Sequence, residues 1–199
     1  MGLRDYLRKR ELRRLAEDRF ILCLDGGGMR GIIPATILTH LEATLRTLGD
    51  DRPLYSHFDL ISGTSTGGLI ALALTSRSRS GSLLTVNRLP LNQSSVDPGP
   101  ELSRIRDIYL RYGRIIFPRS QSLFQIQMIG QLFTEKYDDL SFNHLLRDIF
   151  GEALMEEALT PTMVVTYDFG NDRPFIISSY DRKDIPVRVA ARATSAAPT

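Results

Sequence analysis

Residues 58–76, with the sequence FDLISGTSTGGLIALALTS, decide the fold that we expect for this chain. The apolar run Phe58-Asp-Leu-Ile61 predicts a strand, and the apolar stretch from Gly67 to Ser76 predicts a buried helix. Between them lies Gly63-Thr64-Ser65-Thr66-Gly67, a glycine-flanked serine at the junction of strand and helix. So short a connection between strand and helix indicates one unit of a parallel sheet.

A similar strand–turn–helix unit precedes this one in the chain. Phe20-Ile-Leu-Cys-Leu24 is a continuous apolar run, as expected for a strand covered on both faces, and it ends at Asp25-Gly26-Gly27-Gly28. A helix is predicted from near Gly31 to Leu48, with Pro34 in its first turn. Its apolar face is predicted to consist of Ile33, Ile37, Leu41, Leu45 and Leu48. Two such units predict a three-layer α/β/α domain with a mainly parallel central sheet.

The later sequence predicts more helices and one pair of strands. In chain order these are a helix carrying Leu102, Ile105, Ile108, Tyr109 and Tyr112, a helix capped by Ser141 and carrying Phe142, Leu145, Leu146 and Ile149, strands at 163–169 and 175–180, and a helix from near Pro186. Residues 77–100 are rich in Ser, Asn, Pro and Gly and predict a mobile surface insertion.

Length and composition are those of an ordinary globular domain. The chain has 199 residues, of which 42% are hydrophobic and 24% charged. We divide it into a charged N-terminal helix at residues 1–19 and one α/β domain at residues 20–199. A net charge of +2 gives no reason to expect a nucleic-acid partner. The single cysteine, Cys23, cannot form an intrachain disulfide, which fits a reducing compartment.

Targeting signals are not evident in the sequence. No stretch approaches the roughly 18–20 apolar residues that span a bilayer, and the basic N-terminus lacks the apolar core of a secretory signal. We therefore expect a cytoplasmic protein, or one that binds membranes from the aqueous side. The leucines of residues 1–19 favour packing on the domain over lying on a membrane, because acidic residues dilute the basic face.

Ser65 is the strongest candidate for a reactive side chain. In a G-x-S-x-G turn between strand and helix, the serine sits in a strained conformation that exposes its oxygen. The N-terminus of the helix that follows favours negative charge developing nearby. The alternative is a plain glycine turn without chemistry, which the position of the motif disfavours.

The glycine run Gly26-Gly27-Gly28-Met29-Arg30-Gly31 allows two kinds of site. It matches G-x-G-x-x-G, so a dinucleotide site is one interpretation. However, Asp25 would lie close to a bound pyrophosphate, and Glu42, the acidic residue about 20 positions on, falls in mid-helix. Glycine amides ahead of a helix can equally stabilise an oxyanion, which a serine turn one unit later would require. A glycine turn without chemistry remains a third possibility.

Three blocks of the sequence together resemble the patatin-like phospholipase family. They are Asp25-Gly-Gly-Gly-Met-Arg-Gly-Ile-Ile-Pro-Ala35, Gly63-Thr-Ser-Thr-Gly-Gly68 and Ala193-Thr-Ser-Ala-Ala-Pro-Thr199. The segment Tyr167-Asp-Phe169, followed by Arg173-Pro-Phe-Ile-Ile-Ser-Ser-Tyr180, also resembles the strand pair that precedes the last block. The resemblance covers about residues 19–199.

The resemblance implies a phospholipase A-type or nonspecific lipid acyl hydrolase that needs no cofactor. It implies Ser65 as the nucleophile, an oxyanion hole at Gly26, Gly27 and Gly28, a supporting loop with Arg30 and Gly31, and an elbow shaped by Gly63 and Gly67. Arg30 would orient a lipid phosphate or fix the loop. Ser195, in the third block, would have a packing role. The partner would be a phospholipid or other acyl lipid, and the apolar cluster at 115–126 would be an acyl-chain site, a lid or core.

The family's general base is an aspartate in a second Asp-Gly dipeptide downstream of the Ala-Ala-Pro block. This sequence contains only Asp25-Gly26, so we expect the base beyond residue 199. His40, His57 and His144 do not follow strand-end loops, and Asp168 does not match the family base. No His, Cys and carboxylate cluster has metal-ligand spacing.

Three rival hypotheses remain: a noncatalytic lipid-binding module, a nucleotide-binding protein that uses the glycine run, and a hydrolase with a histidine triad.

Overall fold

The computed structural model describes residues 19–77, 102–116, 131–181 and 184–196. The predicted N-terminal helix and the predicted insertion at 77–100 therefore lie outside the described residues, apart from Arg19 and Arg77 at their edges. Of the apolar cluster at 115–133, the structure describes only backbone at its two ends.

A four-stranded, mainly parallel sheet forms the centre of the fold, as predicted. Its strands are β1 (Ile21–Leu24), β2 (Leu60–Thr64), β3 (Thr162–Asp168) and β4 (Arg173–Ser178). They lie in the order β1-β2-β3-β4, in which β1, β2 and β3 are parallel and β4 is antiparallel to β3. The carboxyl ends of β1, β2 and β3 therefore meet at one edge of the sheet, where ligands bind in open α/β sheets.

The predicted second strand began and ended too early in the sequence. Phe58 closes a short 3-10 helix, η2 (Leu54–His57), by donating its N–H to the Tyr55 carbonyl at 3.4 Å. The strand then runs through Gly63 to Thr64. Sequence reasoning assigned the glycine to a turn, but pairing with β1 and β3 on both sides holds it in the sheet.

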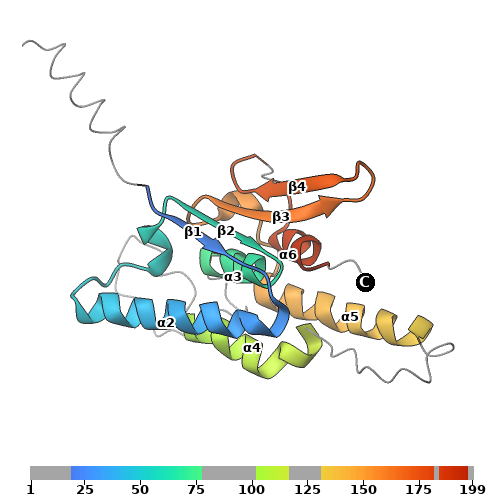
Figure 1. Cartoon of the computed structure of the whole chain (residues 1–199), viewed down its shortest axis with the longest axis horizontal. Helices are drawn as coiled ribbons and strands as arrows, with labels where there is room; N and C mark the ends of the chain where they lie inside the picture. The colour runs from blue at the N-terminus through green and yellow to red at the C-terminus, as the bar shows by residue number, and fades with distance from the viewer. Residues whose placement is uncertain (1–18, 78–101, 117–130, 182–183, 197–199) are drawn as a thin grey trace, which may run out of the picture.

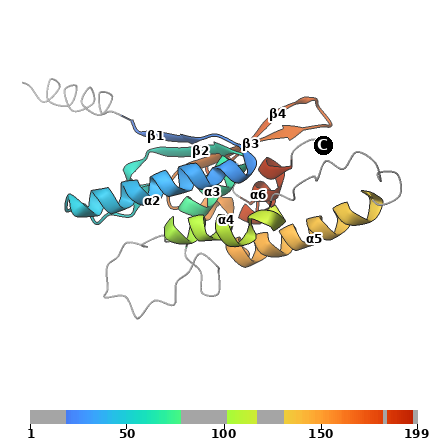
Figure 2. The same cartoon turned by 60° about the horizontal axis from the view of Figure 1, so that its bottom comes forward.

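The helices pack on one side of the sheet, as Figures 1 and 2 show. They are α2 (Ile32–Thr47), α3 (Thr66–Thr75), α4 (Leu102–Ile116), α5 (Gln131–Phe150) and α6 (Val187–Ser195). Helices α3 and α6 lie against the strands, and α4 and α5 lie beneath them (Figure 1). The other face of the sheet exposes Ile21 and Ile176, so a second helical layer is not among the elements that the structure describes.

The hydrophobic core surrounds α3. All ten residues of this helix are buried, which agrees with an apolar sequence on every side. Ile70 and Leu72 contribute to one core with Ile61 of β2 and Val164 of β3. Burying each such side chain contributes about 1.5–3 kcal/mol to folding. The core therefore fixes the start of α3, where Ser65 lies, against the end of β2.

The predicted apolar face of α2 is wrong. Ile33, Ile37, Leu41 and Leu48 are 38–78% exposed, and Leu45 is half-buried. The buried residues are Ala35 and Leu38 instead. Helix α2 packs mainly on α4, so the contact with that helix, and not a wide apolar stripe, decides which of its residues are buried.

Ser141 does not cap a helix, because α5 already begins at Gln131 and runs through it. The side chain of Ser141 is exposed on that helix. The apolar residues predicted to follow it are buried, namely Phe142, Leu145, Leu146 and Ile149. The predicted burial was thus correct, but the predicted start of the helix at Ser141 was wrong, because this serine lies inside a longer helix.

Candidate active site

Ser65 lies in a strained turn between β2 and α3. Its backbone has φ 53° and ψ −124°, a positive φ that residues other than glycine rarely adopt. Such a conformation costs on the order of 1–3 kcal/mol and persists only where surrounding contacts impose it. The tight turn predicted from the G-x-S-x-G sequence is therefore present in the structure.

The glycines on either side of Ser65 are required by close backbone contacts. A Cβ atom on Gly63 would lie 2.3 Å from the Gly67 carbonyl carbon and oxygen. A Cβ atom on Gly67 would lie 2.0 Å from the Leu24 carbonyl oxygen at the end of β1. These contacts bring the end of β1 and the start of α3 together at the serine.

The glycine run after β1 contacts the serine turn directly. A Cβ atom on Gly26 would lie 3.0 Å from the Thr64 carbonyl oxygen and 3.1 Å from Ser65 Cβ. The Thr66 hydroxyl donates a hydrogen bond of 2.8 Å to the Gly28 carbonyl. The two loops that sequence analysis singled out thus form one site at the carboxyl edge of the sheet.

Gly31 and Tyr109 both contact Thr66, the residue after the serine. A Cβ atom on Gly31 would lie 1.8 Å from Thr66 Cγ2. The Tyr109 hydroxyl on α4 donates to the Thr66 carbonyl at 3.0 Å. Burial raises the pKa of Tyr109, so this hydroxyl remains protonated and able to donate. Sequence analysis placed Tyr109 on an apolar helix face and did not find this role.

Arg30 contacts the glycine loop from outside. Its backbone N–H donates to the Gly27 carbonyl at 3.1 Å, and its Nε donates to the same oxygen at 3.3 Å. The side chain is otherwise exposed. Of the two roles that the sequence allowed, fixing the loop is the one for which the structure shows a contact.

Thr194 joins the serine turn to α6 and β3, a role that sequence analysis missed. Its Oγ1 accepts a hydrogen bond of 3.0 Å from the Ser65 N–H and donates one of 2.6 Å to the Val165 carbonyl. The neighbouring Ser195, for which a packing role is predicted, donates to the Ala191 carbonyl within its own helix at 2.7 Å. In the sequence, Thr194 belongs to the third block and directly precedes Ser195.

The candidate carboxylate Asp168 is engaged elsewhere. It accepts hydrogen bonds from the Gly170 N–H at 3.0 Å, from the Asn171 N–H at 3.2 Å and from Asn171 Nδ2 at 2.7 Å. The Asn171 side chain is the main cause of a lowered pKa at Asp168. This carboxylate therefore stabilises the turn between β3 and β4.

The structure does not bring any histidine to the serine within the described residues. His40 is exposed on α2, and His144 is exposed on α5. His57 Nε2 lies 3.9 Å from Asp50 Oδ1, in the connection between α2 and β2. Ser65 is half-buried, and its hydroxyl forms no hydrogen bond with any residue that the structure describes.

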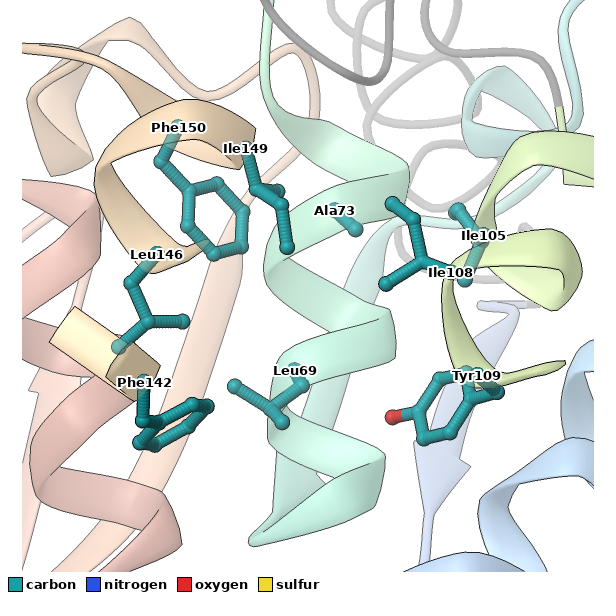
Figure 3. A pocket seen from close by; sticks show the side chains of 9 residues that line it. All are labelled: Leu69, Ala73, Ile105, Ile108, Tyr109, Phe142, Leu146, Ile149 and Phe150. Atoms are coloured by element: carbon teal, nitrogen blue, oxygen red, sulfur yellow. The ribbon is translucent and has the colours of Figure 1, made fainter. Parts of the chain in front are cut away.

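An apolar void lies one helical turn beyond Ser65, between α3, α4 and α5. Figure 3 shows Leu69 of α3 facing Tyr109 of α4 on one side and Phe142 of α5 on the other. The void measures about 20 Å³, which is room for roughly one water molecule. It is therefore a packing defect in this conformation and too small for an acyl chain.

Neither a metal centre nor a membrane span is found in the described ranges. These ranges contain no group of three or more His, Cys, Asp or Glu side chains that could hold a metal ion. No helix within them is long and apolar enough to cross a membrane.

Fold and site together define an α/β protein in which a strained serine turn contacts a glycine-rich loop. Residues 22–199 match the family described as patatin-like phospholipase. The chain is 36% identical over 187 residues to Patatin-like protein 2 of Arabidopsis thaliana, covering 90% of this chain and 42% of that protein. It is 32% identical over 192 residues to Patatin-17 of Solanum cardiophyllum, covering 93% of this chain and 44% of that protein.

The chain therefore belongs to the patatin-like phospholipase family, as the three sequence blocks indicated. It spans less than half the length of these curated relatives.

Proposed function

We propose that the protein to which this chain belongs is a lipid acyl hydrolase with Ser65 as its nucleophile. The Ser65 oxygen attacks the ester carbonyl of an acyl lipid, the alcohol leaves, and water then hydrolyses the acyl-enzyme. The observation that supports this proposal is the direct contact between the serine turn and the glycine run at Gly26. Membership of the patatin-like phospholipase family supports the lipid substrate class. This chemistry needs no cofactor.

The amides around Gly27 and Gly28 are the proposed oxyanion hole, with Gly26 shaping the loop. Arg30 donates to the Gly27 carbonyl, which fixes the peptide unit that carries the Gly28 N–H, and the Thr66 hydroxyl holds the Gly28 carbonyl on the other side of the same residue. Donors fixed in advance stabilise the developing oxyanion without reorganisation, and losing one typically costs about 2.7–4 kcal/mol.

The general base in this proposal is an aspartate from an Asp-Gly segment after residue 199. It would take the Ser65 proton in a Ser–Asp dyad. Among the described residues the Ser65 hydroxyl has no hydrogen-bond partner, and Asp168 is engaged within its own turn; both observations support a base outside those residues. Loss of the base from such a unit typically removes about four orders of magnitude in rate.

Phospholipid hydrolysis by a version extended past Thr199 tests this proposal. We expect release of fatty acid that Ser65→Ala abolishes. Ser56→Ala is the matched control, because Ser56 is an exposed serine whose hydroxyl bonds only the Pro53 carbonyl. Hydrolysis that survives Ser65→Ala would refute the nucleophile assignment. A well-folded extended protein without hydrolysis would favour the noncatalytic lipid-binding module.

A further inference from the structure

Tyr109 lies on α4 and contacts both loops of the candidate site. Its side chain is almost fully buried, since the residue is only 3% exposed. The hydroxyl points toward α3 in Figure 3 and donates to the carbonyl of Thr66, the first residue of that helix, at 3.0 Å. A Cβ atom on Gly31 would lie 3.1 Å from Tyr109 Cε1. One side chain of α4 therefore contacts the start of α3 and the end of the 3-10 helix η1 (Gly28–Gly31).

Thr66 connects Tyr109 to the glycine run. Its backbone carbonyl accepts the hydrogen bond from Tyr109, and its hydroxyl donates to the Gly28 carbonyl at 2.8 Å. Its methyl group lies against Gly31, where an added Cβ atom would come within 1.8 Å of Cγ2. Thr66 is fully buried, and hydrogen bonds in such low-dielectric surroundings are stronger than in water. Thr66 therefore contacts both ends of η1 while its own backbone is held from α4.

The glycine run needs outside contacts because glycine restrains its own backbone least. Gly28 has φ 57°, in the left-handed region that glycine adopts about as readily as the right-handed one. Backbone donors stabilise an oxyanion without reorganisation only where the surrounding structure fixes them beforehand. The exposed Arg30 side chain donates to the Gly27 carbonyl from the surface, whereas Thr66 holds the Gly28 carbonyl from the interior. The interior contact depends on where the start of α3 is held.

Packing alone does not fix the Tyr109 side chain. Tyr109 lines the apolar void of about 20 Å³ between α3, α4 and α5, together with Leu69 (Figure 3). Atoms that line a void lack packing partners on that side. The hydrogen bond to the Thr66 carbonyl is therefore the contact that fixes Tyr109 and the start of α3 relative to each other.

We propose that Tyr109 is a positioning residue for the proposed oxyanion hole and that it acts through Thr66. Its hydroxyl fixes the first peptide unit of α3, and Thr66 in turn holds the Gly28 carbonyl, so that the backbone of Gly28 keeps its orientation beside Ser65. Tyr109 itself does not contact the substrate in this role. The inference rests on the proposed function, because it assigns a task to a residue that supports the proposed oxyanion hole.

Hydrolysis of the soluble ester p-nitrophenyl butyrate by the version extended past Thr199 tests this role. Tyr109→Phe should lower kcat by about tenfold and leave KM nearly unchanged, because an oxyanion forms only in the transition state. This loss is smaller than the roughly 100-fold or greater loss that follows removal of an oxyanion donor itself. A tyrosine with a merely structural role would instead lower the unfolding temperature without changing the kcat of the folded protein. Tyr55→Phe is the matched control and should leave kcat unchanged, because Tyr55 is a buried tyrosine of η2, before the amino end of β2.

Variants of Thr66 test whether Tyr109 acts through this residue. Thr66→Val removes the hydroxyl but keeps the shape, so it should lower kcat at least as much as Tyr109→Phe, whereas Thr66→Ser keeps the hydroxyl and should lose less. Tyr109→Phe combined with Thr66→Val should lose no more than Thr66→Val alone, because residues of one hydrogen-bond network are not additive. Thr75→Val is the control, since Thr75 is a buried threonine at the other end of α3 whose hydroxyl bonds the Ala71 carbonyl within that helix at 2.9 Å.

The outcomes distinguish this inference from the proposed function. An active extended protein whose kcat is the same with Tyr109→Phe would overturn the positioning role alone. Losses that multiply in the double variant would overturn the route through Thr66. A folded extended protein that does not hydrolyse the ester, or that still hydrolyses it after Ser65→Ala, would overturn the proposed function and this inference with it.

Discussion

The backbone N–H of Ser65 donates to Thr194 Oγ1 at 3.0 Å, and the same hydroxyl donates to the Val165 carbonyl at 2.6 Å. One side chain thus satisfies a donor in the serine turn and an acceptor on β3. This pair of bonds fixes the end of α6 against the strained backbone of Ser65. We infer that Thr194 helps to impose the unfavourable φ of the serine turn.

Thr194→Val should destabilise the protein more than Thr194→Ser. Valine keeps the shape but removes the hydroxyl, which leaves the Ser65 N–H and the Val165 carbonyl without their partner. Each unsatisfied buried group costs about 1–3 kcal/mol. Serine keeps both bonds and loses only a methyl group. Denaturant unfolding measures both variants, and equal stability of the two would show that the hydroxyl does not support the turn.

Gly67→Ala should be among the most damaging single substitutions. The added methyl group would lie 2.0 Å from the Leu24 carbonyl, so β1 and α3 would have to separate. We expect a loss of roughly 3 kcal/mol or more in unfolding free energy, or no folded protein. Gly170→Ala is the control, because its Cβ would lie 3.4 Å from one Asp168 carboxylate oxygen and clash with no backbone. A well-folded Gly67→Ala protein would contradict the close approach at the elbow.

Tyr109→Phe should alter how stability depends on pH in the alkaline range. Burial raises the folded-state pKa of Tyr109 above its unfolded value of about 10. The unfolded state therefore releases this proton first as pH rises, so the stability due to Tyr109 is intact below about pH 10 and is lost above it. Unfolding free energies of the wild-type and phenylalanine proteins, measured between about pH 9 and 11, should converge. Parallel curves would contradict a buried, protonated Tyr109.

Much of this fold could be predicted from the sequence because the local signals agreed. The apolar run before Asp25 and the glycine-flanked serine before α3 both predicted parallel βα units, and both are present. The strand pair β3 and β4 was also predicted to within a few residues. In each case the hydrophobic period and the turn residues favoured the same element.

The predictions were wrong or incomplete where contacts with distant parts of the chain decide which residues are buried or bonded. The apolar residues of α2 repeat about every four positions, yet the buried residues of this helix are Ala35 and Leu38, and Ile37 is exposed. A sequence pattern does not reveal which face a neighbouring helix will cover. The role of Thr194 was likewise hidden, because it depends on a contact with a residue 129 positions away.

The most direct test of the account is the site of covalent labelling by a fluorophosphonate probe. The probe should react with one serine in a version extended past Thr199, and peptide mass spectrometry should place the adduct on Ser65. Ser65→Ala should abolish labelling, whereas Ser56→Ala should not change it. The account predicts weak or absent labelling of the 199-residue chain alone. Labelling of a different serine, or equal labelling after Ser65→Ala, would contradict the claim that Ser65 is the nucleophile.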